Sequence, residues 1–139
     1  MIKKIAFDID GVLQDYQEYV VNTFLNQHHH ITGEKYNGRI DYTQYDSRRM
    51  FPDCRNTDIV NMSVDHIFAD YVRHAPFEPH VRDLFRYLKS KKIEIHIVTA
   101  RQGNEGISSD EMEQITKDRF FEEDIPVDEF HIGFNDKLT

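Results

Sequence analysis

The segment KKIAFDIDGVL, at residues 3–13, constrains the fold most, because its apolar run ends in two aspartates that a single residue separates. The nearly continuous apolar run over residues 3–9 is typical of a strand that a parallel sheet buries. Two neighbouring carboxylates repel each other and are costly to desolvate beside a core. We therefore expect another group in the folded protein to compensate Asp8 and Asp10.

The composition predicts one acidic globular core, since 39% of the 139 residues are hydrophobic and the formal net charge is −8. Lys89, Lys91 and Lys92 form the longest basic cluster, and they close an expected helix, where cations offset unpaired carbonyls. Cys54 is the only cysteine, and the first apolar stretch is interrupted by aspartates. We therefore expect a cytoplasmic protein whose partners include no membrane and no nucleic-acid polymer.

Hydrophobic periodicity predicts an alternation of strands and helices. Strands are expected over residues 3–9, 93–98 and 129–133, and helices over residues 16–30, 59–72, 79–92 and 108–123. Residues 31–58 show no sustained period and are expected to be irregular apart from one short element. This order indicates a doubly wound α/β fold with parallel strands and right-handed crossovers.

The strand ends carry the candidate site, because ligands bind at the C-terminal ends of parallel strands. Residues two apart along an extended segment share a side, so Asp8 and Asp10 are expected to address one point. A Mg²⁺ ion there would remove their repulsion, since it prefers hard oxygen ligands. Thr99 and Lys137 follow the other two expected strands and suit a phosphate oxygen and its charge. The sequence therefore predicts phosphoryl transfer, with one carboxylate attacking phosphorus and the other donating a proton.

The motifs DIDGV, at residues 8–12, and IVTAR, at residues 97–101, strongly resemble two motifs of the haloacid dehalogenase superfamily of phosphotransferases. With its cap-sized insertion, the chain is most similar to the 5'(3')-deoxyribonucleotidase branch. The resemblance implies that Asp8 is the nucleophile that forms an aspartyl phosphate and that Asp10 is the general acid and base. It implies Mg²⁺ on the Asp8 side chain and the Asp10 backbone carbonyl. It further implies that Thr99, Ala100 and Arg101 bind the phosphate and that Lys137 is the third-motif lysine.

The implied fold is a haloacid dehalogenase-like parallel sheet with helices on both faces and a small helical cap. We assign residues 1–15 and 76–139 to the core and residues 16–75 to the cap. Lys117, in ITKDRF, is a rival for the third-motif lysine; Lys137 is preferred because it follows a strand, whereas Lys117 should point from a helix face.

The fourth motif of that family, an acidic pair after a fourth strand, would lie beyond Thr139, and Asp136 is a poor substitute because it adjoins the lysine. The strands missing from the family's order flank the first strand. We therefore expect residues 3–9 to form an apolar sheet edge, in a chain that is truncated or that a second copy covers as a homo-oligomer.

Three functions follow from these observations. The first is a Mg²⁺-dependent phosphomonoesterase that acts on a nucleoside monophosphate or a similar small phosphate ester. The second is a remnant of the fold that has a binding or regulatory role or no activity, because its fourth motif is missing. A phospho-acceptor signalling domain ranks last, since its phosphorylated aspartate follows a middle strand and no cap interrupts its first crossover.

Other residues have simpler structural interpretations. Adjacent histidines diverge around a helix, so a solvated helix end is expected at residues 28–30 rather than a metal site. Aromatic residues of a small cap more often build its core than stack on a base. The aromatic residues concerned are Tyr36, Tyr42, Tyr45 and Phe51, and the basic residues of the same region are Arg48, Arg49 and Arg55. We expect the arginines to lie on the surface.

Overall fold

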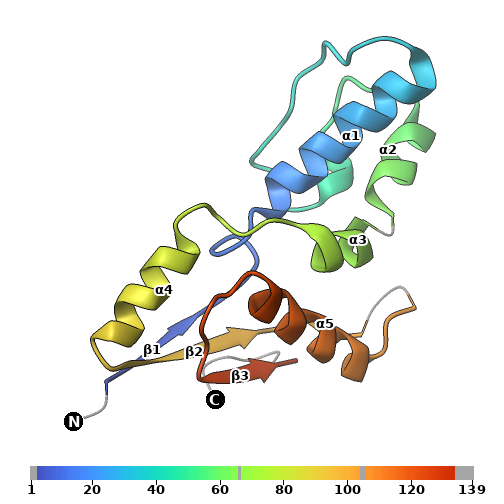
Figure 1. Ribbon diagram of the computed structural model, residues 1–139. Helices are drawn as coiled ribbons and strands as arrows, with labels where there is room; N and C mark the ends of the chain where they lie inside the picture. Colours follow the sequence, from blue (N-terminus) through green and yellow to red (C-terminus); the bar gives the residue numbers. More distant parts are fainter. Residues whose placement is uncertain (1–2, 66, 104–105, 134–139) are drawn as a thin grey trace. The chain divides into compact units, whose positions relative to one another are not determined.

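The computed structural model describes residues 3–65, 67–103 and 106–133 (Figure 1). Its contacts divide the chain into two compact units, Met1–Asp15 with Val72–Thr139 and Tyr16–Tyr71. The second boundary therefore falls between Tyr71 and Val72, rather than after Ala75. None of the described helices is long and apolar enough to cross a lipid bilayer.

The first unit contains a three-stranded parallel sheet in the order β1-β2-β3 (Figure 1). Its strands are β1 (Lys3–Phe7), β2 (Ile93–Thr99) and β3 (Glu129–Ile132). Ile97 of β2 lies opposite Phe7 on one side and Phe130 on the other, so these three side chains share a face. The α/β fold with parallel strands is confirmed, although β1 ends at Phe7 rather than at Ile9.

Two helices pack on one face of this sheet. Phe85 of α4 (Val81–Ser90) and Phe120 of α5 (Ser109–Glu122) belong to one buried cluster with Ile97. Because the chain crosses the sheet in one direction, from β1 to β2 to β3, two right-handed crossovers carry both helices to the same face. We had expected helices on both faces of the sheet. In the described part of the chain, helices cover only one face.

Strand β1 is an edge of the sheet within the described residues, where it pairs with β2 alone. Four of its five residues are exposed, and Ile5 keeps 37% of its surface accessible. The expected apolar edge is therefore present in the described part of the sheet.

The start of α5 follows its sequence signal. The Ser108 side chain accepts a hydrogen bond from the backbone N–H of Glu111 at 3.1 Å, as the spacing of a capping box predicts. This cap sets the first turn of the helix that brings Phe120 to the sheet.

Asp128 joins the strands to α4. Its Oδ2 accepts the backbone N–H of Ile95 at 2.7 Å, and its Oδ1 lies 2.6 Å from Nζ of Lys89. Burial acts to raise the pKa of Asp128, but the hydrogen bonds from Lys89 and Ile95 outweigh burial, so the pKa lies below its ordinary value of 3.8. This carboxylate therefore stabilises the start of β3 in its charged form.

Replacing Asp128→Asn should lower the free energy of unfolding at neutral pH by about 1 kcal/mol, because the partly exposed ion pair with Lys89 is lost. A lowered carboxyl pKa gives stability that is present above the unfolded pKa and is lost as the pH falls through the folded pKa. In urea unfolding, the difference between wild type and variant should shrink as the pH drops below the ordinary value of 3.8. An unchanged difference in acid would contradict this role.

The second unit contains α1 (Tyr16–Thr32), the short 3-10 helix η1 (Ser47–Arg49) and α2 (Thr57–Val64). The next helix, α3 (Ile67–His74), begins in this unit. The single helix expected over residues 59–72 is wrong, because Asp65 has an extended backbone with ψ 135° that ends α2.

Aromatic packing forms the core of the second unit. The rings of Phe24 and Phe51 stack with centroids 3.7 Å apart, and Tyr36 meets Phe24 edge-on at 5.0 Å. Phe51 is 2% exposed, whereas Tyr42 is 57% exposed. The core interpretation therefore holds for Tyr36 and Phe51, but it is wrong for Tyr42 and Tyr45, which are both exposed.

Surface positions of the second unit agree with the simpler interpretations. Arg48 is exposed and forms an ion pair with Asp65. His29 and His30 are exposed in the last turn of α1, which is the expected helix end.

Candidate active site

The chain bends sharply directly after β1. The backbone carbonyl of Ile9 accepts three backbone N–H groups, from residues 12–14, at 2.8 to 3.1 Å. Gly11 has φ +80°, a conformation that glycine adopts without steric cost. The extended backbone therefore ends before Asp8. The rule that residues two apart share a side does not apply to Asp8 and Asp10.

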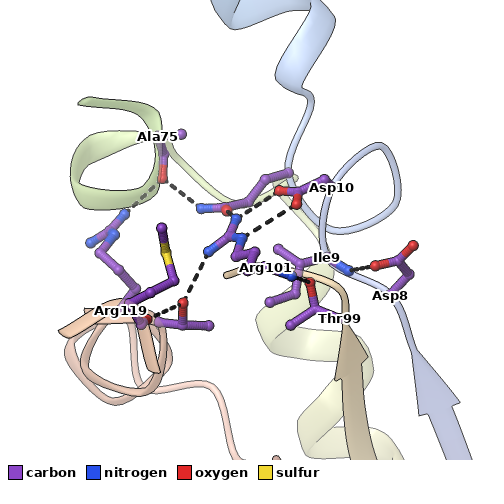
Figure 2. A network of polar contacts seen from close by, with 10 residues as sticks. Asp8, Ile9, Asp10, Ala75, Thr99, Arg101 and Arg119 are labelled. Atoms are coloured by element: carbon purple, nitrogen blue, oxygen red, sulfur yellow. Dashed lines mark hydrogen bonds and ion pairs between the residues drawn. The ribbon is translucent and has the colours of Figure 1, made fainter. Parts of the chain in front are cut away.

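Asp8 and Asp10 point to different sides of this bend (Figure 2). Oδ1 of Asp8 accepts the backbone N–H of Ile9 at 2.8 Å, while the Asp10 carboxylate faces Arg101. The expectation that both carboxylates address one point is not met in this structure, because the backbone turns at Ile9.

The group that compensates Asp10 is a buried guanidinium (Figure 2). Nη2 and Nε of Arg101 lie 2.7 and 3.3 Å from the two Asp10 oxygens, an arrangement in which both carboxylate oxygens are engaged. The Arg101 side chain is 2% exposed and the Asp10 side chain 31% exposed. The charge of Asp10 is therefore balanced by Arg101, and the metal ion that we expected between the aspartates is not needed for this purpose.

The same guanidinium organises further buried polar groups (Figure 2). Nη2 of Arg101 donates to Oε1 of Gln14 at 2.7 Å, and Nε2 of Gln14 donates to the carbonyl of Ala75 at 2.8 Å. Nη1 of Arg101 lies 3.4 Å from Oγ1 of Thr116, and Nη2 of Arg119 also donates to Ala75 at 2.8 Å. We call Asp10, Gln14, Ala75, Arg101, Thr116 and Arg119 the arginine network.

Sequence reasoning missed Gln14, Ala75, Thr116 and Arg119. Arg101 is separated from Asp10 by 91 positions and from Gln14 by 87 positions, so no local pattern connects them. The available signal was Arg101 itself, because an arginine directly after a buried strand requires acceptors if the fold buries it.

The other predicted site residues lie in separate environments. Thr99 ends β2, is 1% exposed, and accepts the backbone N–H of Arg101 on Oγ1 at 3.3 Å. Ala100 is exposed. Lys117 lies on α5 and pairs with Glu113 one turn earlier at 2.9 Å, as expected for a residue on a helix face. Lys137 lies outside the described residues.

Two ligand sets for Mg²⁺ were expected: the Asp8 carboxylate with the Asp10 backbone carbonyl, and the carboxylates of both residues. Only the first set fits Mg²⁺ here. The Asp8 carboxylate and the Asp10 backbone carbonyl are hard oxygen donors of the kind that Mg²⁺ prefers. The Asp10 carboxylate is engaged by two Arg101 nitrogens, so it does not offer a second carboxylate ligand in this structure. The first of these ligand sets is the one that the resemblance implies.

Replacing Arg101→Met should destabilise the protein by about 3 kcal/mol or more, because it leaves the Asp10 carboxylate and buried acceptors without their cation. Urea unfolding followed by circular dichroism measures the change. Arg86→Met is the matched control, since Arg86 pairs with Asp124 on the surface and should cost less than about 1 kcal/mol. Equal effects of the two replacements would show that the arginine network is not a stabilising centre.

Comparison with known proteins identifies the family of the chain. Residues 5–132 match the family model described as haloacid dehalogenase-like hydrolase. The chain therefore belongs to this family. No curated protein sequence matches the chain.

Solved structures share the fold at low sequence identity. A hydrolase from Streptococcus pneumoniae TIGR4 has a TM-score of 0.60 and 16% identity, over 99% of this chain and 72% of that one. A haloacid dehalogenase superfamily hydrolase of subfamily IA, variant 1, from Geobacter sulfurreducens PCA has a TM-score of 0.55 and 18% identity, over 97% and 65%. A proposed β-phosphoglucomutase from Thermotoga maritima has a TM-score of 0.53 and 17% identity, over 98% and 63%. The chain spans less than two thirds of the last two.

Proposed function

We propose that the chain acts as a Mg²⁺-dependent phosphomonoesterase through an aspartyl phosphate on Asp8. The observation that carries the proposal is the placement of Asp8 and Thr99 directly after β1 and at the end of β2, which are adjacent parallel strands of a haloacid dehalogenase-like hydrolase. The C-terminal ends of such strands form one edge, so both groups belong to the ligand-binding edge of the sheet.

In the first half of the proposed reaction, an Asp8 oxygen attacks phosphorus and the bond from phosphorus to the ester oxygen breaks. Asp10 donates a proton to that oxygen, which leaves as an alcohol. Thr99 supports the phosphate, because its Oγ1 accepts the Arg101 N–H and its own hydroxyl hydrogen can donate to a phosphate oxygen. Bound Mg²⁺ would supply charge stabilisation for the phosphoryl group.

In the second half, Asp10 removes a proton from a water molecule, whose oxygen attacks the phosphorus of the aspartyl phosphate. The acyl phosphate bond breaks and Asp8 is regenerated as a carboxylate, with inorganic phosphate as the second product. The proton that Asp10 gave to the alcohol is thereby replaced, so the cycle closes without any other reactant.

This mechanism requires the arginine network to open. Both Asp10 oxygens accept N–H groups of Arg101, and Thr99 is 1% exposed. For proton transfer, Asp10 must turn from Arg101 toward Asp8, and a phosphate must displace packing around Thr99. The reactive state that we propose therefore differs from this structure at Asp10, after β1, and around Thr99, at the end of β2.

A nucleoside monophosphate is the substrate class that we propose, by resemblance to the 5'(3')-deoxyribonucleotidase branch. The neighbour from Thermotoga maritima is itself proposed to be a β-phosphoglucomutase. Support for the nucleotide in particular comes from the TAR segment at residues 99–101 and the inserted unit.

A second candidate is a binding or regulatory member of the fold without catalysis. The divergence of Asp8 and Asp10 and the pairing of Asp10 with Arg101 favour it (Figure 2). If the network stays closed, Asp10 cannot exchange a proton with a group held at Asp8.

Phosphate release from a nucleoside monophosphate and from a generic aryl phosphate, with and without Mg²⁺, separates these candidates. The proposed enzyme should release phosphate only with Mg²⁺, and Asp8→Asn should reduce the rate by about 10³-fold or more, because the nucleophile is lost. Asp83→Asn, an exposed position on α4, is the matched control and should keep the wild-type rate. Wild type and Asp8→Asn that are equally inert in saturating Mg²⁺ would establish the second candidate.

A further inference from the structure

The sheet face that α4 and α5 leave uncovered carries a cluster of nitrogen and oxygen ligands. His96 of β2 lies opposite Glu129 of β3, and Val98 lies opposite His131. Side chains two apart on neighbouring strands share a face, which brings His96, Glu129 and His131 together. None of these residues belongs to the arginine network or to the ends of β1 and β2.

The separations within this cluster lie within a few tenths of an ångström of those in a metal site. Nδ1 of His96 lies 3.0 Å from Nε2 of His131, and Glu129 oxygens lie 3.7 Å from the first nitrogen and 3.8 Å from the second. Four ligands at zinc bond lengths in a tetrahedron are separated by roughly 3.3 to 3.6 Å. One ion can therefore reach all three side chains with small rotations.

The surroundings also favour a cation. Nε2 of His96 is buried and has no hydrogen-bond partner within the described residues, and it lies 3.7 Å from a Glu94 oxygen. A carboxylate beside the second ring nitrogen is the usual support for a metal-bound histidine. Lys4 lies 3.9 Å from Glu94, whereas the ion-pair contacts of Glu129 in the part of the chain that the structure describes are with His96 and His131.

We propose that His96, Glu129 and His131 bind one divalent transition-metal ion of the zinc class. Two imidazole nitrogens with one carboxylate select such an ion over Mg²⁺, which prefers oxygen ligands alone. Three protein ligands leave the fourth position to water. The bound ion joins β2 to β3 across the uncovered face and stabilises the folded state by mass action.

Isothermal titration of the metal-stripped full chain with Zn²⁺ tests this site. One ion should bind per chain, a large excess of Mg²⁺ should not displace it, and His131→Ala and Glu129→Gln should each weaken binding by at least about tenfold. Glu129 is 56% exposed in its side chain, so Glu129→Gln should keep the fold even if His131→Ala does not. His80→Ala, an exposed position in the same unit, should leave binding unchanged.

Two further variants separate this site from the rest of the chain. Asp8→Asn should bind Zn²⁺ as the wild type does, whatever its phosphatase activity. Replacing His28, His29 and His30 together by alanine removes the other histidine cluster of the sequence. This variant should also bind Zn²⁺ normally and, with Co²⁺, should show the intense visible absorption of a four-coordinate ion. The proposal is overturned if Zn²⁺ fails to bind, if binding survives Glu129→Gln unchanged, or if the alanine variant loses it.

Discussion

The ion pair between Asp10 and Arg101 is the interaction on which the first unit depends. A guanidinium that is 2% exposed must find acceptors for its donors, and it finds them in Asp10, Gln14 and Thr116. These acceptors come from the bend after β1 and from α5, so one side chain after β2 connects three parts of the chain. The positions of the candidate site residues follow from this connection.

The same interaction opposes the proposed chemistry. An aspartate that stabilises the fold by pairing with Arg101 is withheld from proton transfer, and a buried Thr99 is withheld from phosphate. The two roles are compatible if substrate and Mg²⁺ bind an open arrangement more tightly than the closed one, because a ligand shifts an equilibrium by its difference in affinity. Stability and activity then compete for Asp10.

Sequence reasoning predicted the elements whose signals are local. The alternating pattern of β2 and the Ser108 cap are set by neighbouring residues, whereas the edge position of β1 was expected from the strand order of the family that the chain resembles. It failed where distant contacts or a backbone bend decide: the hydrogen bonds to the Ile9 carbonyl turn Asp8 away from Asp10, and the extended backbone at Asp65 divides one expected helix. The arginine network could not be predicted either, because its contacts join residues that are far apart in the sequence.

A double-mutant cycle between Asp10→Asn and Arg101→Met, read by urea unfolding without Mg²⁺, tests the central claim most directly. If Arg101 balances the partly buried charge of Asp10, the two replacements should be coupled by about 2 kcal/mol, because either one alone leaves its partner uncompensated. Additive effects, with a coupling below about 0.5 kcal/mol, would contradict the claim that this ion pair organises the site.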